Sequence, residues 1–203
     1  MPIVCVRIAA FPEDDAARWD DVLDALDAAS PVVEDAGPGL AFLEMAGIEG
    51  GAGGWLDAVR GALAGFDLPL RVGLGPNPFV AQAAAALGEG TICEGDPAAF
   101  LAPFPLEQLG CGEAVCGRLR LLGIGTLGEL AALPHGPFVR RFGPPAGRWH
   151  EHARGIDRSA RTGIQLRFRL PGRHDNFHYG AREPVPGQAR CERVVLIRGC
   201  LDY

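Results

Sequence analysis

Hydrophobic residues in the first hundred positions switch between the spacing of strands and the spacing of helices. Short apolar runs bounded by Gly and Pro have the length of buried strands. Apolar residues at i, i+3, i+4 and i+7, as in Trp19, Val22, Leu23 and Leu26, predict an amphipathic helix instead. The strand-like and helix-like stretches follow one another in the order 3–8, 19–26, 31–34, 40–45, 55–66, 68–74, 79–87 and 91–93. This order predicts helices packed on a sheet of mixed strand directions.

From about residue 103 the pattern changes to short helices separated by Gly-rich turns. A helix with its apolar residues Val115, Leu119 and Leu122 on one side lies between the turns 110–112 and 123–126. The chain is therefore expected to be an α+β protein. Its expected parts are an α/β domain at 1–102, an all-α domain at 103–160 and a Pro-, Gly- and Arg-rich tail at 161–203. Because the tail has little apolar periodicity, we expect it to be loosely held.

Charge divides the chain at nearly the same place. The 203 residues carry 19 basic and 25 acidic side chains, a net charge of −6. Residues 1–102 hold 4 Arg against 16 acids, a net −12, whereas residues 103–203 hold 15 Arg against 9 acids, a net +6. Such a basic half either forms a plain solvated surface or binds a polyanion.

Composition excludes several classes of protein. Hydrophobic residues make up 48% and charged residues 22% of the chain, close to the globular average, which argues against a disordered or fibrous chain. No apolar run approaches the roughly 18 residues of a membrane span, so a cytoplasmic protein without a membrane partner is expected. The six cysteines contain no Cys-x-x-Cys pair and are expected to be free thiols, and no metal or cofactor is expected.

The two Gly-x-Gly turns suggest contacts with a nucleic-acid backbone. Each would expose backbone amides at a helix N-terminus, where unpaired N–H groups and the helix dipole favour a phosphate. Two such turns around one helix form a helix-hairpin-helix unit, which holds the backbone without reading bases. The alternative is that both are tight turns of a small helical bundle, with Gly present for its left-handed conformation. The predicted DNA-binding residues are Gly110, Cys111, Gly112, Arg118, Arg120, Gly123, Gly125, Thr126, Arg140 and Arg141.

These features in this order resemble a known family. The stretch from Phe100 to Leu130 resembles the thumb of Y-family translesion DNA polymerases, and residues 139–143 and 153–157 resemble its continuation. Residues 33–47 and 72–77 resemble segments of the palm. The chain is most similar to the polymerase-like ImuB branch. The resemblance implies a palm at 1–102, a helix-hairpin-helix thumb at 103–160 and a linker with a little-finger remnant at 161–203.

The metal-binding carboxylates of the family are missing from their expected positions. The register of its two first-strand aspartates falls on Arg7 and Ala9, and that of its second acidic pair falls on Gly39 and Leu40. Two-metal phosphoryl transfer needs such carboxylates. These departures predict that the chain is not an enzyme.

The nucleotide-binding side of the family is also depleted. Two family lysines fall on Pro78 and Gln82, and the segment from Phe11 to Trp19 is too short to contain a fingers domain. By this resemblance, the lid over an incoming nucleotide is absent. Like the missing carboxylates, this absence predicts that the chain is not an enzyme.

The leading hypothesis is a non-catalytic, DNA-binding accessory protein of DNA repair and error-prone translesion synthesis in the SOS response. The resemblance implies a mutagenic polymerase, a RecA-like accessory protein and a sliding clamp as partners. Residues 165–168 are loosely similar to a clamp-binding peptide and otherwise fit a linker strand. One alternative is a minimal nucleotidyltransferase that uses Glu34, Asp35 and Glu44, and another is a truncated relic whose chain ends at Tyr203 with little function.

Overall fold

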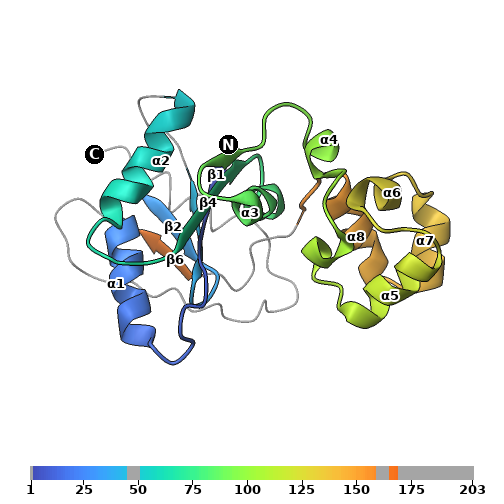
Figure 1. Ribbon diagram of the computed structural model, residues 1–203, viewed down its shortest axis with the longest axis horizontal. Helices are drawn as coiled ribbons and strands as arrows, with labels where there is room; N and C mark the ends of the chain where they lie inside the picture. Colours follow the sequence, from blue (N-terminus) through green and yellow to red (C-terminus); the bar gives the residue numbers. More distant parts are fainter. Residues whose placement is uncertain (1, 45–50, 159–164, 169–203) are drawn as a thin grey trace, which may run out of the picture.

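The computed structural model describes residues 2–44, 51–158 and 165–168. These residues form two parts, a sheet with helices on both faces and a group of short helices beside it (Figure 1). This is the α+β arrangement that the sequence predicts. The expectation of a loosely held tail falls almost entirely outside the described residues.

The sheet has six strands in the order β5-β4-β1-β3-β2-β6. Neighbouring strands are antiparallel, except for the parallel pair of β4 and β5. The sheet is therefore mixed, as expected. The strands are β1 (Ile3–Ile8), β2 (Val32–Asp35), β3 (Leu40–Glu44), β4 (Leu70–Gly75), β5 (Thr91–Ile92) and β6 (Gln165–Phe168).

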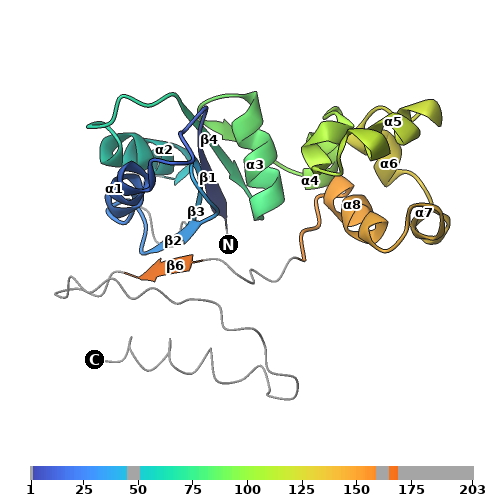
Figure 2. The ribbon, with the colours of Figure 1, turned by 90° about the horizontal axis from the view of Figure 1, so that it is seen from below.

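Three helices cover the sheet. Helices α1 (Ala16–Leu26) and α2 (Gly51–Ala62) lie on one face, and α3 (Pro78–Leu87) lies on the other, between the sheet and the second part of the chain (Figure 2). The carboxylate of Asp15 caps α1 and the amide oxygen of Asn77 caps α3, each by accepting a backbone N–H of the first turn.

The central strand β1 is apolar on both faces, because both faces are covered. Val4, Val6 and Ile8 pack into the core that includes residues of α1 and α2, whereas Ile3 and Cys5 pack with Ala81 and Ala85 of α3. Successive side chains of a strand point to opposite faces. Arg7 therefore points to the face that α3 covers.

The second part of the chain is helical. Its elements are α4 (Pro97–Leu101), the 3-10 helix η1 (Leu106–Leu109), α5 (Glu113–Leu121), α6 (Leu127–Ala131), α7 (His135–Phe142) and α8 (Pro145–Ala153). One buried cluster holds them together, and Phe79, Val80 and Ala83 of α3 belong to this cluster. No helix in the parts of the chain that the structure describes is long and apolar enough to cross a membrane.

The two parts are joined by specific contacts at the N-terminal end of α3. The side-chain amide of Asn77 donates to the carbonyl of Gly155 at 2.8 Å, and the ring of Phe79 stacks on His152 with 4.3 Å between ring centroids. After the helical part the chain returns to the sheet, where β6 pairs with β2. Residues 165–168 are thus a linker strand in this structure.

Helix α3 approaches β4 so closely that the strand needs Gly at two positions. A Cβ atom on Gly73 would lie 2.2 Å from the backbone nitrogen of Ala85, and one on Gly75 would lie 2.6 Å from that of Ala81. These neighbours are backbone atoms, which cannot turn aside as a flexible side chain does.

We expect Gly73→Ala to destabilise the protein by about 1–3 kcal/mol or more, because α3 must move away from the sheet. The matched control is Gly61→Ala. Gly61 lies in α2, where an added Cβ would meet no neighbouring atom within 4 Å, so Ala there should be neutral or stabilise the helix by up to about 1 kcal/mol. Unfolding in urea gives the free energy of unfolding of the two variants. Equal values for Gly73→Ala and Gly61→Ala would contradict the packing argument.

Candidate nucleic-acid interface

The first hairpin has an open helix N-terminus. Gly110 and Gly112 adopt φ angles of +63° and +80°, and Gly112 begins α5 without a hydrogen bond from any capping side chain. The N–H groups of Val115 and Cys116 both donate to the carbonyl of Gly112, which starts the helix. The N–H of Gly110 donates to the carbonyl of Glu107, whereas no side chain caps the amides that begin α5. Uncapped N–H groups at a helix N-terminus favour an anion.

The second hairpin is closed by its own helix. The backbone N–H groups of Gly125 and Thr126 donate to Oε2 of Glu129 at 2.7 and 3.1 Å, and the N–H of Glu129 donates to Oγ1 of Thr126 at 3.3 Å. This is a capping box. These donated hydrogen bonds, those of the Gly125 and Thr126 amides foremost, lower the pKa of Glu129. A phosphate at this hairpin must displace an internal carboxylate, so the first hairpin is the more accessible of the two.

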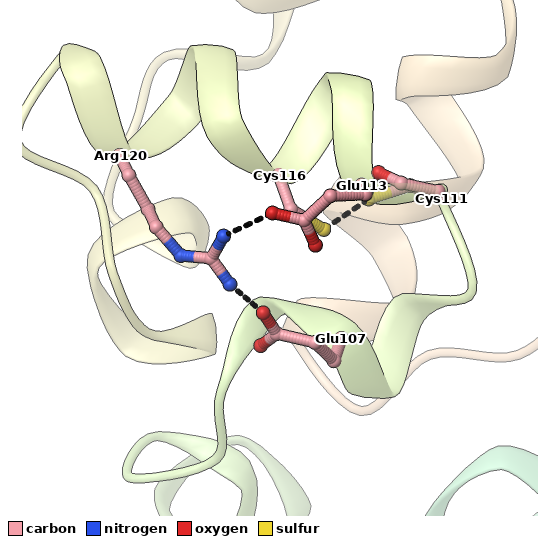
Figure 3. A network of polar contacts seen from close by, with 6 residues as sticks. Glu107, Cys111, Glu113, Cys116 and Arg120 are labelled. Atoms are coloured by element: carbon pink, nitrogen blue, oxygen red, sulfur yellow. Dashed lines mark hydrogen bonds and ion pairs between the residues drawn. The ribbon is translucent and has the colours of Figure 1, made fainter.

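Arg120 is held in a local network of charges. Its guanidinium forms ion pairs with Glu107 of η1 and, at 2.9 Å, with Glu113 of α5 (Figure 3). All three side chains are well exposed. Two acids therefore offset the charge of one of the predicted DNA-binding arginines.

The remaining predicted arginines are placed differently. The guanidinium of Arg118 lies 5.0 Å from the ring centroid of Phe142, which ties α5 to α7 by a cation–π contact. Arg140 and Arg141 are exposed in the last turn of α7 and, within the described ranges, take part in no ion pair. These two side chains keep their full charge for a partner.

Cys111 in the first hairpin lies beside Cys116 of α5. Their sulfur atoms are 3.2 Å apart, and both are free thiols (Figure 3). Burial, together with the hydrogen bond between the two thiols, raises the pKa of Cys111 to about 12. Cys111 is therefore a neutral thiol at neutral pH, and its contact with Cys116 packs the hairpin against the helix.

The resemblance places metal-binding carboxylates at four positions, and these lie around the end of β1: Arg7, Ala9, Gly39 and Leu40. Arg7 has Leu40 of β3 and Arg71 of β4 as its cross-strand neighbours. Gly39 has φ +82°, and a Cβ there would lie 2.9 Å from the Cβ of Phe11 and 3.0 Å from the carbonyl oxygen of Ile8. The backbone at residue 39 thus disfavours any side chain, a carboxylate included. Ala9, in the turn after β1, is held through its N–H to the carbonyl of Pro69.

The three acids of the alternative nucleotidyltransferase do not converge. The carboxylate of Asp35 accepts hydrogen bonds from Nε1 of Trp19 and the N–H of Gly37, both at 2.9 Å, so it lies on the α1 face. Glu34 and Glu44 lie on the opposite face, because their cross-strand neighbours Phe42 and Ile3 pack on the α3 face. Asp35 is therefore separated from the other two acids by the sheet. In the described part of the chain no group of three or more His, Cys, Asp or Glu side chains could hold a metal ion. These residues do not fit the pair of magnesium ions of the family.

The comparison with known proteins gives relatives for most of the chain. No family model matches it. DNA polymerase IV of Moorella thermoacetica is 38% identical over 93 residues, which cover 43% of this chain and 23% of that protein. Protein ImuB of Caulobacter vibrioides is 28% identical over 165 residues, which cover 79% of this chain and 35% of that protein. The chain thus spans less than half the length of these relatives.

A solved structure shows the same fold. The crystal structure of DinB from Sulfolobus solfataricus superposes with a TM-score of 0.66 at 14% identity, covering 80% of this chain and 69% of that chain. The sheet with its helices therefore has the palm fold of Y-family polymerases. We refer to residues 97–153, which follow it, as the thumb, after the part of the family that their sequence resembles. Together with the named relatives, the fold makes the chain Y-family polymerase-like over the part of those proteins that it spans.

The prediction that the chain is not an enzyme is wrong. Its relatives include a protein named DNA polymerase IV, so the likeness is to polymerases as well as to ImuB. The prediction took the loss of carboxylates at Arg7, Ala9, Gly39 and Leu40 as the loss of an activity. Metal ions are held by whichever carboxylates converge in space, and the described residues leave part of the chain out. Vacant register positions among the described residues do not establish inactivity.

Sequence reasoning missed the carboxylate that closes the second hairpin. Its signal is present, because Thr126 and Glu129 form the Ser/Thr-x-x-Glu pattern of a capping box. The Arg120 network has a weaker signal. Glu113 precedes Arg120 by seven residues, two helical turns, but Glu107 reaches it from a separate element.

We expect Glu129→Gln to lower the melting temperature at neutral pH, with a smaller loss at acid pH. Because the folded-state pKa of Glu129 is lowered, its stabilising contribution is present above the unfolded-state pKa and is lost as pH falls through the folded-state value. Melting curves of the parent and the variant from pH 7 down to pH 3 should therefore converge. Glu94→Gln, on an exposed palm side chain, is the control. A difference that widens on acidification would rule out this role for Glu129.

Proposed function

We propose that this chain binds the backbone of DNA without sequence preference through its thumb, as part of translesion synthesis. The observation that carries the proposal is the first hairpin, where α5 begins without a hydrogen bond from any capping side chain. A phosphate satisfies such amides and benefits from the helix dipole. Phosphate contacts fix the position of a protein on DNA and do not read its sequence.

The distribution of charge supports the same orientation on DNA. The half of the chain that contains the thumb carries a net +6, and the half that contains the palm carries −12. The DNA backbone repels the acidic half and attracts the basic half. Arg140 and Arg141 supply charge that no neighbouring acid offsets within the described residues.

We also propose the organisation of the chain that the sequence predicts. It consists of a palm at 1–102, a thumb at 103–160 and a linker with a little-finger remnant at 161–203. The likeness to Protein ImuB supports a place in translesion synthesis beside a mutagenic polymerase and a RecA-like accessory protein. Cytoplasmic localisation follows from action on DNA in a bacterial-type repair system and is proposed with it.

We expect the affinity for primer-template DNA to fall steeply between 50 and 200 mM salt. Each phosphate contact should add about 0.9 to the slope of log K against log salt concentration. Replacing Arg140 and Arg141 together by Ala should flatten this slope by up to about 2 and weaken all DNA sequences alike. Fluorescence anisotropy with labelled DNA over a salt series measures both quantities.

The charge-matched control replaces Arg18 of α1 and Arg60 of α2, two exposed arginines on the sheet face opposite α3, by Ala. This control should leave the slope within about 0.5 of the parent value, because these side chains lie outside the thumb. No binding at 50 mM salt, or the same loss in both double variants, would contradict binding through the thumb.

A further inference from the structure

A cavity of about 380 Å³ lies between the palm and the thumb. Arg7 of β1 and Gln82 of α3 line it from the palm, and Gln108 of η1 and Arg148 of α8 line it from the thumb. Cavities from about 300 Å³ upward are large enough for a small ligand or one unit of a polymer. Two guanidiniums and two amides, from two separate parts of the chain, therefore face one space.

The charges at this cavity favour an anion. It is also lined by two acids, Glu107 and Asp157. Glu107 forms an ion pair with Arg120, and Asp157 lies 3.4 Å from Nε2 of His152. Neither Arg7 nor Arg148 takes part in an ion pair among the described residues. Glu107 is thus paired with a cation outside the cavity lining, and Asp157 lies beside His152 within it, while Arg7 and Arg148 are exposed and free of ion pairs among the described residues.

His152 provides a second and independent observation. Its side chain is only 7% exposed and lines the cavity, stacked on Phe79. Its buried Nε2 meets no hydrogen-bond acceptor in good geometry among the described residues and lies 3.4 Å from Oδ1 of Asp157. His152 therefore gives the cavity a buried polar wall beside its two cationic groups.

The first hairpin connects this cavity to the proposed path of DNA. Gly110, in that hairpin, lies on the cavity's rim. A strand with one phosphate at the hairpin amides can thus place a neighbouring phosphate in the cavity. Arginine suits this task, because its planar fork of donors binds phosphate oxygens directly in a bidentate manner.

We propose that Arg7 and Arg148 bind a phosphate group of a nucleic-acid strand in this cavity, without a divalent cation between protein and phosphate. The site rests on the proposed function, because the strand reaches it from the thumb. Arg7 stands where the resemblance places a metal-holding carboxylate, and the described residues do not fit the metal pair. In this proposal, the guanidinium binds the phosphate directly, in place of a metal ion that would link the phosphate to a carboxylate.

The test is the affinity for labelled primer-template DNA in EDTA at low salt. Arg7→Ala and Arg148→Ala should each weaken binding by about tenfold and flatten the salt slope by about 0.9. Arg7→Lys and Arg148→Lys should keep the slope and recover part of the affinity, because lysine keeps the charge and loses the fork. Arg18→Ala, on the exposed surface of α1, is the matched control and should change neither quantity. Since Arg7 and Arg148 are both exposed, melting temperatures should match the parent within a few degrees.

The outcomes separate this site from the proposed function. Absence of DNA binding by the parent chain would overturn both. Binding that falls in the Arg140 and Arg141 double variant but is unchanged in Arg7→Ala and Arg148→Ala would overturn the cavity site alone. An effect of these two variants that appears with Mg²⁺ and vanishes in EDTA would overturn direct binding by the guanidiniums.

The source of the phosphate is tested by competition. Inorganic phosphate and a deoxynucleoside triphosphate are each titrated against bound DNA in EDTA at constant ionic strength. We expect neither to displace DNA at concentrations near the protein's affinity for DNA. Tight binding of the triphosphate that requires both Arg7 and Arg148 would assign the cavity to a free nucleotide and overturn the assignment to a strand.

Discussion

The packing of α3 between the sheet and the thumb is the contact on which both halves of the chain depend. One side of α3 lies so close to β4 that Gly73 cannot be replaced by a larger residue without moving backbone atoms. Its other side inserts Phe79 and Val80 into the core of the thumb. Asn77 caps the same helix and also holds Gly155 at the end of the thumb. Because one rigid helix contributes to both cores, it fixes the positions of the groups that face the cavity.

Some of the hydrogen-bond donors and cationic side chains of the thumb are already bound by carboxylates of the thumb itself. Glu129 occupies the amides of the second hairpin, and Glu107 and Glu113 offset Arg120. Both arrangements stabilise local structure, and both compete with a phosphate for the same donors. Counting Gly-x-Gly turns and arginines therefore overstates the surface that is ready for DNA. The donors left open are those at the first hairpin and on the arginines without acid partners.

The elements of the fold were predictable because they depend on local spacing, and the site was less so because it depends on distant contacts. The short apolar run at residues 3–8 and the helical period from Trp19 to Leu26 are local signals, and the strand and helix follow them. The pairing of β6 with β2 joins residues more than 120 positions apart, and the meeting of Arg7 with Arg148 joins residues 141 positions apart. No periodicity encodes such neighbours. They follow from tertiary packing of α3 and α8, which the sequence pattern does not specify.

At one position of the palm sheet, a guanidinium stands where the resemblance places a carboxylate, and the strand pairing around it is intact. Arg7 keeps its place in the register of β1 between β3 and β4, and the apolar residues before it still pack under α3. At Gly39 the change extends to the backbone, since a left-handed φ and the nearby Phe11 leave no room for a side chain. A carboxylate at such a face attracts a cation, which in turn attracts phosphate. A guanidinium attracts phosphate itself. In the binding that we propose, Arg7 therefore attracts directly the phosphate that a carboxylate attracts only through a bound cation.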